Sequence, residues 1–428
     1  MTSPRGTLGR LMWPVYVPSF TYAAGVSALL PAQVLLALHL GFSAAGVALL
    51  ATVVGGFGVV ASLAAGSLVQ RCGESRALLL ATAPGVGLAF ATWATVVAGR
   101  GAGAGDGTQA ARALLVATVL AFDLADAVWG IARQGLVADL AAPEHRGRAM
   151  NVYGASQRLG RVAGPFVAAA VLAVLGPEYV FPVTAAIVVG AYGVMTHHLP
   201  GKGPDAPGAT PPPGPGEAGP AAGTPRRGVL ALALGIVAIA AVRTAKETLM
   251  PLWGADGLGL PPATVALVVG VSSLAELVLF WPAGVALDRL GRGPVAATCL
   301  ALMGIGLAIM TASTDPVWFV ATALLVGLGD GVGAGIVKTI GIDLAPDVGR
   351  GRFLGRWQAV SSAGSFAAPA LAGAVIAHAS LAAALPTVGA IGLVGAAWMG
   401  WWTPRILGSP RRRATPTAGG SPGRSRQA

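Results

Sequence analysis

Charged residues are scarce in this chain of 428 residues: they make up 11% of it, whereas 54% of its residues are hydrophobic. A soluble globular protein carries about 25% charged residues, which cover its surface. So few charges exclude a water-soluble protein of this size and indicate the lipid bilayer as the solvent. Aromatic residues are also few, at 6%, while 63 glycines supply the small side chains that let membrane helices approach closely.

Cysteines and the common catalytic motifs are nearly or wholly missing. The two cysteines, Cys72 and Cys299, fall in a short turn and in an apolar run, so we expect no structural disulfide. The sequence has no GxxxxGK[ST] phosphate loop, no HExxH, no CxxC and no nucleophile elbow. We therefore expect a protein that is not an enzyme and that has no metal site and no cofactor.

Twelve apolar runs are each long enough to cross a bilayer, which requires about 20 residues in a helix. Unpaired strands cannot cross lipid, so these runs are predicted to be helices. The predicted spans are residues 12–38, 44–69, 76–98, 112–138, 149–175, 179–199, 228–252, 264–287, 294–313, 316–341, 354–379 and 382–403.

A stretch rich in proline and glycine separates the sixth run from the seventh and reads as a flexible linker. We predict an all-α integral membrane protein with two pseudo-symmetric six-helix bundles. The predicted boundaries are 1–199 for the first bundle, 200–227 for a cytoplasmic linker, 228–404 for the second bundle and 405–428 for a basic, disordered cytoplasmic tail.

The net charge of +11 reflects membrane topology and not a nucleic-acid surface, because the basic residues gather at the ends of the runs and in the tail. With the N-terminus inside, 22 of the 28 Lys and Arg residues lie on the cytoplasmic side, 2 lie outside and 4 lie deep within spans. The 22 include Arg133, Lys338 and Arg356 at the cytoplasmic ends of their spans. Both termini are therefore predicted to be cytoplasmic, in a plasma membrane that composition suggests is bacterial.

The two halves repeat each other. The stretch GVALDRLGRGP (Gly284–Pro294) matches the earlier GSLVQRCGESR at an offset of 218, and the residues from Asp139 match those from Asp343 at an offset of 204. The later copy follows the loop signature of the major facilitator superfamily, which the chain resembles over nearly its whole length. Residues 139–165 resemble the fourth loop and fifth helix of drug–proton antiporters. The resemblance implies that superfamily's fold of twelve helices.

Charges and glycines at the ends of the spans are predicted to form a cytoplasmic gate. Asp288 is expected to reach the start of the helix near Ala149, and Arg289 to pair with Asp343, with contacts worth roughly one to three kcal/mol while that side is closed. Gln70 is the counterpart of Asp288 in the first half but has no charge. The gate contacts of each half are called a latch here, and the latch at Gln70 is predicted to be the weaker one. Alternatively, these charges only anchor loops and set topology. The predicted gate comprises Gly66, Gln70, Arg71, Gly73, Asp139, Arg146, Arg148, Gly284, Asp288, Arg289, Gly291, Arg292, Asp343, Arg350 and Arg352.

Ionisable residues within the spans are candidates for binding protons or substrate, because they are costly in lipid. At 1.5 Å per residue, Asp126 and Arg161 lie at similar depths and are predicted to pair, as are Arg243 and Glu276. Burial favours the neutral form of a carboxylate and a nearby Arg its charged form, so a changing environment would exchange a proton. Static ion pairs that brace the helices are the alternative. The candidates are Asp123, Asp126, Arg158, Arg161, Arg243, Lys246, Glu247, Glu276 and Asp330.

These features predict secondary active transport by alternating access. The resemblance favours proton-coupled export of small amphipathic or hydrophobic compounds, driven by a proton gradient. Two alternatives remain: import of a polar or anionic metabolite, which the four intramembrane cations would support, and a sensor or scaffold with a transporter-like fold. The expected partners are a small-molecule substrate, protons and the lipid bilayer, with no nucleic acid, and we expect a monomer.

Overall fold

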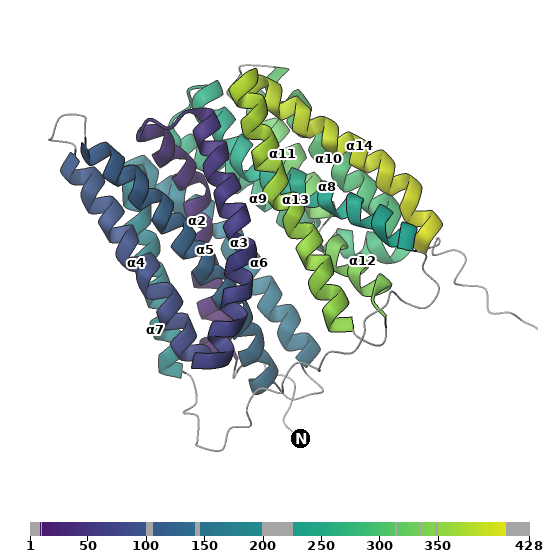
Figure 1. Ribbon diagram of the computed structural model, residues 1–428, viewed down its shortest axis with the longest axis horizontal. Helices are drawn as coiled ribbons and strands as arrows, with labels where there is room; N and C mark the ends of the chain where they lie inside the picture. Colours follow the sequence, from purple (N-terminus) through teal and green to yellow (C-terminus); the bar gives the residue numbers. More distant parts are fainter. Residues whose placement is uncertain are drawn as a thin grey trace, which may run out of the picture.

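The computed structural model describes residues 9, 11–99, 106–141, 146–198, 226–312, 315–333, 335–346 and 350–407. Long helices make up nearly all of this part (Figure 1). A π-helical turn, η1 (Met12–Tyr16), leads into the first helix, and a 3-10 turn, η3 (Pro177–Tyr179), precedes the last helix of the first half. The helices of this half are α2 (Val17–His39), α3 (Ala44–Cys72), α4 (Glu74–Gly99), α5 (Asp106–Leu140), α6 (Arg146–Val174) and α7 (Val180–His198).

The second half is built in the same way, with two short turns, η4 (Trp253–Gly257) and η5 (Met310–Ala312), at helix ends. Its helices are α8 (Arg226–Leu252), α9 (Pro262–Arg289), α10 (Arg292–Ile309), α11 (Pro316–Val332), α12 (Ile336–Leu344), α13 (Arg350–His378) and α14 (Leu381–Leu407).

Local sequence explains where several helices begin and end. The Ser43 hydroxyl accepts a hydrogen bond from the Gly46 amide at 3.1 Å and caps α3. Asp315 caps α11 in the same way, with Pro316 at the first helical position. The turns after α3 and α9 contain Gly73 (φ 75°) and Gly291 (φ 88°), backbone angles that favour glycine.

Eleven helical stretches among the described residues are long and apolar enough to cross a membrane. They correspond to eleven of the twelve predicted spans. The remaining predicted span, 149–175, is part of α6, which has 29 residues. Arg158 and Arg161 make the first half of α6 more polar than the other helices.

The tenth predicted span, 316–341, corresponds to the candidate span Pro316–Leu344, which consists of two helices. It divides into α11 and α12 between Val332 and Ile336. Gly335 has a φ of 83°, a left-handed conformation in which glycine carries no steric cost. Arg243 of α8 donates to the carbonyl of Asp330 at 3.3 Å and so satisfies a backbone group at the end of α11.

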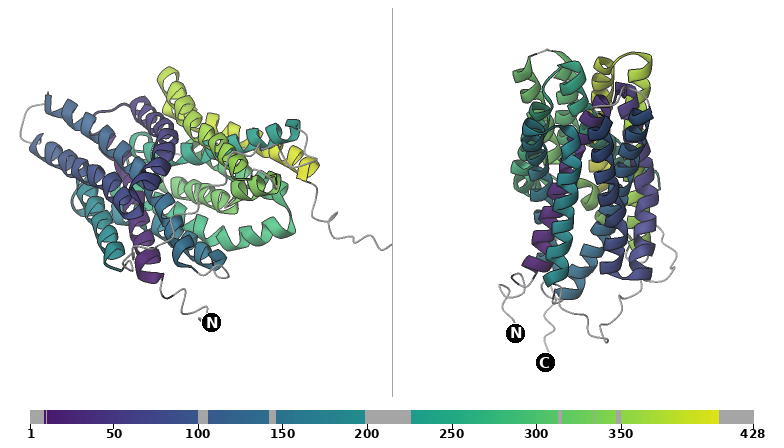
Figure 2. Two further views of the ribbon diagram at one scale, coloured as in Figure 1. Left: turned by 60° about the horizontal axis from the view of Figure 1, so that its bottom comes forward. Right: turned by 90° about the vertical axis from the view of Figure 1, so that its left-hand side faces the viewer.

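The two halves lie side by side. Figure 1 shows α2–α7 (purple to teal) on one side and the helices from α8 onward (teal to yellow) on the other, and Figure 2 shows them running in a common direction. Within the halves, α2 packs on α6, α4 on α5, α10 on α14 and α8 on α13. Across the boundary, α3 packs on α13 and α6 on α9.

The halves contact each other at one end of the molecule and separate at the other. The linker end is defined here as the end where α7 stops at His198 and α8 starts at Arg226. At the opposite end, a Cβ on Gly55 of α3 would lie 3.3 Å from the Ser365 carbonyl of α13, and one on Gly270 would lie 3.1 Å from the Phe166 ring. Towards the linker end, Figure 1 shows α3 and α13 diverging, and Cβ atoms on Gly66 of α3 and Gly284 of α9 would meet no atom within 4 Å.

Candidate functional site

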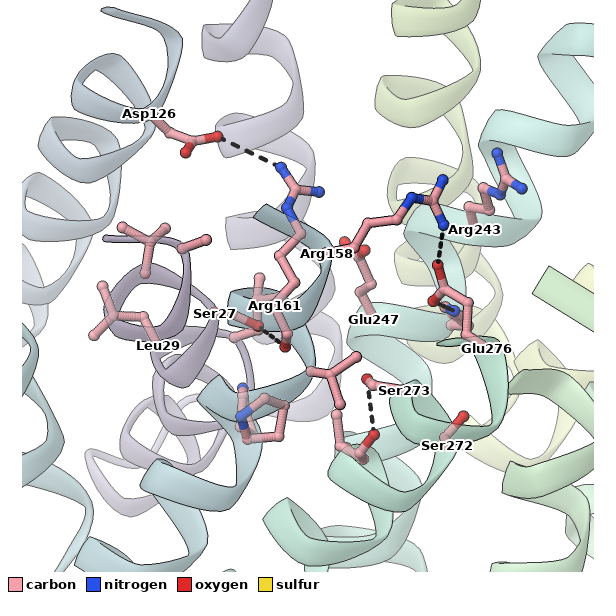
Figure 3. A pocket seen from close by; sticks show the side chains of 18 of the residues that line it. Ser27, Leu29, Asp126, Arg158, Arg161, Arg243, Glu247, Ser272, Ser273 and Glu276 are labelled. Carbon is pink, nitrogen blue, oxygen red and sulfur yellow. Dashed lines mark hydrogen bonds and ion pairs between the residues drawn. The ribbon is translucent and has the colours of Figure 1, made fainter. Parts of the chain in front are cut away.

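A central cavity of about 620 Å³ lies between the two halves (Figure 3). Its lining comes from α2, α3, α5 and α6 of the first half, and from α8, α9, α11 and α12 of the second. Each side of the cavity therefore belongs to a different half of the chain. A molecule bound in it would contact both halves at once.

Charged side chains from six helices converge on this cavity. Each of the nine intramembrane residues that the sequence proposed as proton or substrate sites lines it, and Lys338 of α12 joins them. The cavity thus carries five carboxylates and five cations: Asp123, Asp126, Glu247, Glu276 and Asp330, with Arg158, Arg161, Arg243, Lys246 and Lys338. Its lining has no net formal charge but presents both signs to a ligand.

In the first half, Arg161 of α6 faces Asp126 of α5, as their equal depths predicted. Arg161 Nη2 lies 4.0 Å from Asp126 Oδ2, and the two side chains are 67% and 45% exposed. The Ser27 hydroxyl of α2 donates to the Arg161 carbonyl at 2.8 Å and fixes the local backbone of α6. An exposed pair at this distance is weak, so both groups are accessible to a ligand or to water.

Asp123 lies one turn before Asp126 on α5. Its Oδ2 atom is buried and, among the described residues, has no hydrogen-bond partner. It faces Gly58 of α3, where a Cβ would come within 3.3 Å of it. Burying a charged oxygen without a donor is costly, so Asp123 remains a candidate for carrying a proton.

In the second half, Asp330 of α11 holds two cations of α8. Its carboxylate accepts hydrogen bonds from Arg243 Nε and from Lys246 Nζ, and its side chain is 8% exposed. The predicted pair of Arg243 with Glu276 is therefore wrong. Arg243 and Glu276 line the same cavity, but the Arg243 guanidinium is directed towards Asp330 of α11.

Glu276 of α9 is shared between the halves. Its Oε1 lies 3.6 Å from Arg158 Nη1 of α6, and its Oε2 lies 3.7 Å from Lys246 Nζ of α8. Figure 3 shows the Arg158 and Glu276 side chains facing each other. The charges therefore form a chain from Arg243 through Asp330, Lys246 and Glu276 to Arg158, which crosses from the second half to the first.

Apolar side chains line another part of the same cavity, among them Leu29 of α2, Val54 of α3 and Phe122 of α5. Figure 3 shows Leu29 on the side away from Glu276. Neutral hydrogen-bonding groups, such as Gln157 and Ser272, also line it. Ligand pockets typically combine apolar surface with a few polar groups that orient the ligand, which is the combination found here.

The sequence matches the family model described as Major Facilitator Superfamily over residues 15–261 and 232–425. The chain belongs to the major facilitator superfamily. Its family accordingly makes it a membrane transporter. No curated protein matches the chain by sequence.

Solved structures share the fold at low identity. A mutant of the peptide transporter POT in complex with alafosfalin is 15% identical, with a TM-score of 0.68 over 95% of this chain and 99% of that one. A POT family transporter in complex with 5-aminolevulinic acid is 12% identical, with a TM-score of 0.66 over 94% of this chain and 97% of that one. These likenesses support the superfamily fold alone.

The loop signature of this superfamily member lies at the linker end. Arg292 of α10, and not Arg289, pairs with Asp343 of α12, with Nε 2.7 Å from Oδ2. The pair lies within one half and forms although the halves are apart at this end, so it is not the closed-side contact predicted for Asp343. Gln70, Arg71 and Arg289 are exposed. Side chains outside the described part are those of Asp139, Arg146, Arg148, Asp288, Arg350 and Arg352.

Two cations that the sequence placed at the cytoplasmic ends of their spans contact other parts of the protein. Lys338 of α12 lines the central cavity. Arg133 is only 1% exposed: its guanidinium stacks 4.2 Å from the Trp129 ring, donates to the Val15 carbonyl at 2.9 Å and also contacts Ser19. Positive charge near a span end suggested topology for both residues.

Proposed function

We propose that this transporter works by alternating access between two six-helix bundles, residues 1–199 and 228–404. In this proposal α6 also crosses the membrane and brings the eleven spans to twelve. The linker over 200–227 and the tail over 405–428 belong, in this proposal, to the cytoplasmic side of a bacterial plasma membrane. The linker end then faces the cytoplasm. The positive-inside distribution of Lys and Arg supports this orientation.

One observation carries the proposal: the charged central cavity is built from both halves, which touch at the end away from the linker and separate towards it. Rocking the halves about this cavity would expose it first to one side of the membrane and then to the other. A ligand that contacts both halves favours one arrangement over another only through such differential contacts.

Proton coupling is proposed for the carboxylates of the cavity, with Glu276 and Asp126 as the leading carriers. Each faces an Arg across an ion pair longer than a hydrogen bond, at 3.6 Å and 4.0 Å. A carboxylate that loses its Arg neighbour in one arrangement and regains it in the other changes its affinity for protons. Asp330, held by two short bonds, fits the static role of bracing α11 against α8.

The proposed substrates are small amphipathic compounds, exported in exchange for protons. Apolar side chains such as Leu30 and Val54 would take the apolar part, and the charged chain across the cavity would take the polar part. The resemblance of residues 139–165 to drug–proton antiporters supports the export direction.

The test is proton flux in reconstituted vesicles with an imposed pH gradient. Addition of a transported amphipathic compound should evoke proton movement with the wild type. Glu276→Gln and Asp126→Asn should each abolish the coupling while the protein remains monodisperse. Unchanged gradient-driven transport in both variants would remove them as proton carriers. A sensor or scaffold would bind ligand and change conformation without any flux.

Uptake of a polar or anionic metabolite is the second candidate, because five cations line the cavity. The direction of net substrate movement under an inward proton gradient separates the two. Accumulation inside right-side-out vesicles supports uptake, and expulsion supports export. Arg243→Ala should impair binding of an anionic substrate, whereas transport of a cation need not depend on it.

A further inference from the structure

We propose that Arg158 of α6 and Lys246 of α8 form a subsite for an anionic group of the transported compound, and that the Glu276 carboxylate competes for it. The inference rests on the proposed transport function, because it assigns the charge of the compound that the same cavity takes. The chemistry required is a carboxylate, sulfonate or phosphonate at one end of an amphipathic molecule.

The contacts of Glu276 are long enough for a ligand to displace its carboxylate. Its carboxylate oxygens lie 3.6 Å from Arg158 and 3.7 Å from Lys246, and both distances exceed a hydrogen bond. Its side chain is 32% exposed within the cavity. An anion that reached hydrogen-bond distance of the same two cations would form stronger, charge-assisted bonds.

Asp330 supplies the contrast within the same chain of charges. It binds Lys246 and Arg243 by short hydrogen bonds and is nearly buried. A ligand that replaced it would have to break both bonds and leave the nearly buried Asp330 carboxylate without a counterion, which is costly. Competition from a ligand is therefore directed to Glu276, while Asp330 keeps Lys246 in position.

The two cations belong to different halves, which gives their anion a role in conformational change. Arg158 comes from the first half and Lys246 from the second, so an anion between them connects the halves directly. Its binding energy then depends on how the halves are placed, as transport requires.

The remaining charges that line the cavity nearly balance, at three cations and four carboxylates. Arg243 and Asp330 neutralise each other, and Glu247 of α8 lies in a cavity whose five carboxylates are matched by five cations. A volume of about 620 Å³ has room for an apolar tail beside the charged chain. An amphipathic anion thus fits both the electrostatics and the shape of the cavity.

The experiment is equilibrium binding of hexanesulfonate to the full-length protein in lipid nanodiscs, by isothermal titration calorimetry without a proton gradient. The sulfonate group stays charged in every titration, so a change in Kd reports a change in the protein and not in the ligand. Glu276→Gln should lower the Kd for hexanesulfonate about tenfold, because the internal competitor loses its charge. Adding Arg158→Gln to that variant should raise the Kd about tenfold again. Arg76→Gln, an exposed change on α4 outside the cavity, should match the wild type.

Hexyltrimethylammonium, a cation of similar size, should show the reverse order, with weaker binding in Glu276→Gln. The proposal is overturned if Glu276→Gln binds hexanesulfonate no more tightly than the wild type, which is what a purely structural bridge would give. Should that variant fail to fold, Glu276→Asp replaces it: its shorter side chain reaches the cations less well and should also lower the Kd. Binding as expected without vesicle flux would refute transport but not the subsite, and flux without anion binding would refute the subsite alone.

Discussion

Replacing Asp330 by Asn should destabilise this protein far more than the equivalent change at Asp126. Asp330 accepts short hydrogen bonds from two cations of α8, and it is 8% exposed while Lys246 is 12% exposed. Removing its charge takes away the counterion that Arg243 and Lys246 share, and leaves Lys246 only the longer contact with Glu276 at 3.7 Å. Breaking a buried pair in this way costs about 3–5 kcal/mol.

Asp126→Asn is the matched control, because the same atoms change within the same cavity. Its partner Arg161 lies 4.0 Å away, and the two side chains are 67% and 45% exposed. Exposed pairs of this kind contribute about 0–1 kcal/mol. The two variants should therefore differ by about 3 kcal/mol in the free energy of unfolding.

The assay is thermal unfolding in detergent, followed by the monodisperse fraction that remains after heating. The midpoint for Asp330→Asn should fall clearly, while that for Asp126→Asn should stay close to the wild type. Adding Lys246→Met to Asp330→Asn should restore part of the loss, because one of the two stranded cations is removed. Equal midpoints for the two single variants would show that burial of the Asp330 pairs does not stabilise the fold.

Two further changes test the backbone and the linker end. Gly335→Ala should cost about 1–2 kcal/mol of stability, because alanine is strained at a φ of 83°. Gly87→Ala on α4 is the control: the added Cβ would meet no atom within 4 Å, so this change should be neutral or stabilising. Thermal unfolding midpoints of the two variants compare them. Gln70→Asp should favour closure of the linker end and slow the labelling of a cysteine placed at Gly154, where the structure is open. Ser67→Asp, one turn away on α3, should leave labelling unchanged, and equal effects of both would count against a latch at Gln70.

Much of the helical framework follows from composition and periodicity. Apolar runs of about 20 residues must be helical in lipid, and eleven of those predicted qualify in the structure as spans. The glycines of the repeated turns were also predictable, since Gly73 and Gly291 adopt positive φ. These features depend on a few neighbouring residues, so a single sequence contains them.

The pairing of buried charges was only half predictable. Depth along a helix follows from counting residues, and it correctly placed Asp126 opposite Arg161. Depth says nothing of the direction in which a helix turns its side chains. Arg243 therefore lay at the right level for Glu276 but faces Asp330, and Glu276 faces Arg158 across the boundary between the halves.

The break in the tenth span also depends on distant partners. Residues 327–335 are rich in glycine, and local sequence does not say whether such a segment serves as a hinge or as a close-packing surface. Two tertiary contacts go with the observed break: Arg243 satisfies the carbonyl of Asp330, and Trp357 of α13 donates to the carbonyl of Val337 at 2.9 Å. The same break carries Lys338 into the cavity.

The chain of charges is tight at one end and loose at the other, and this difference bears on how the halves can move. Asp330 ties α11 to α8 by short bonds within the second half, whereas Glu276 reaches Arg158 of the first half only at 3.6 Å. A displacement of one half against the other changes the Arg158–Glu276 distance, whereas the Asp330 contacts lie within the second half. The most weakly held charges in the chain are therefore those that a relative motion must rearrange, and they are also those that the cavity exposes to a ligand.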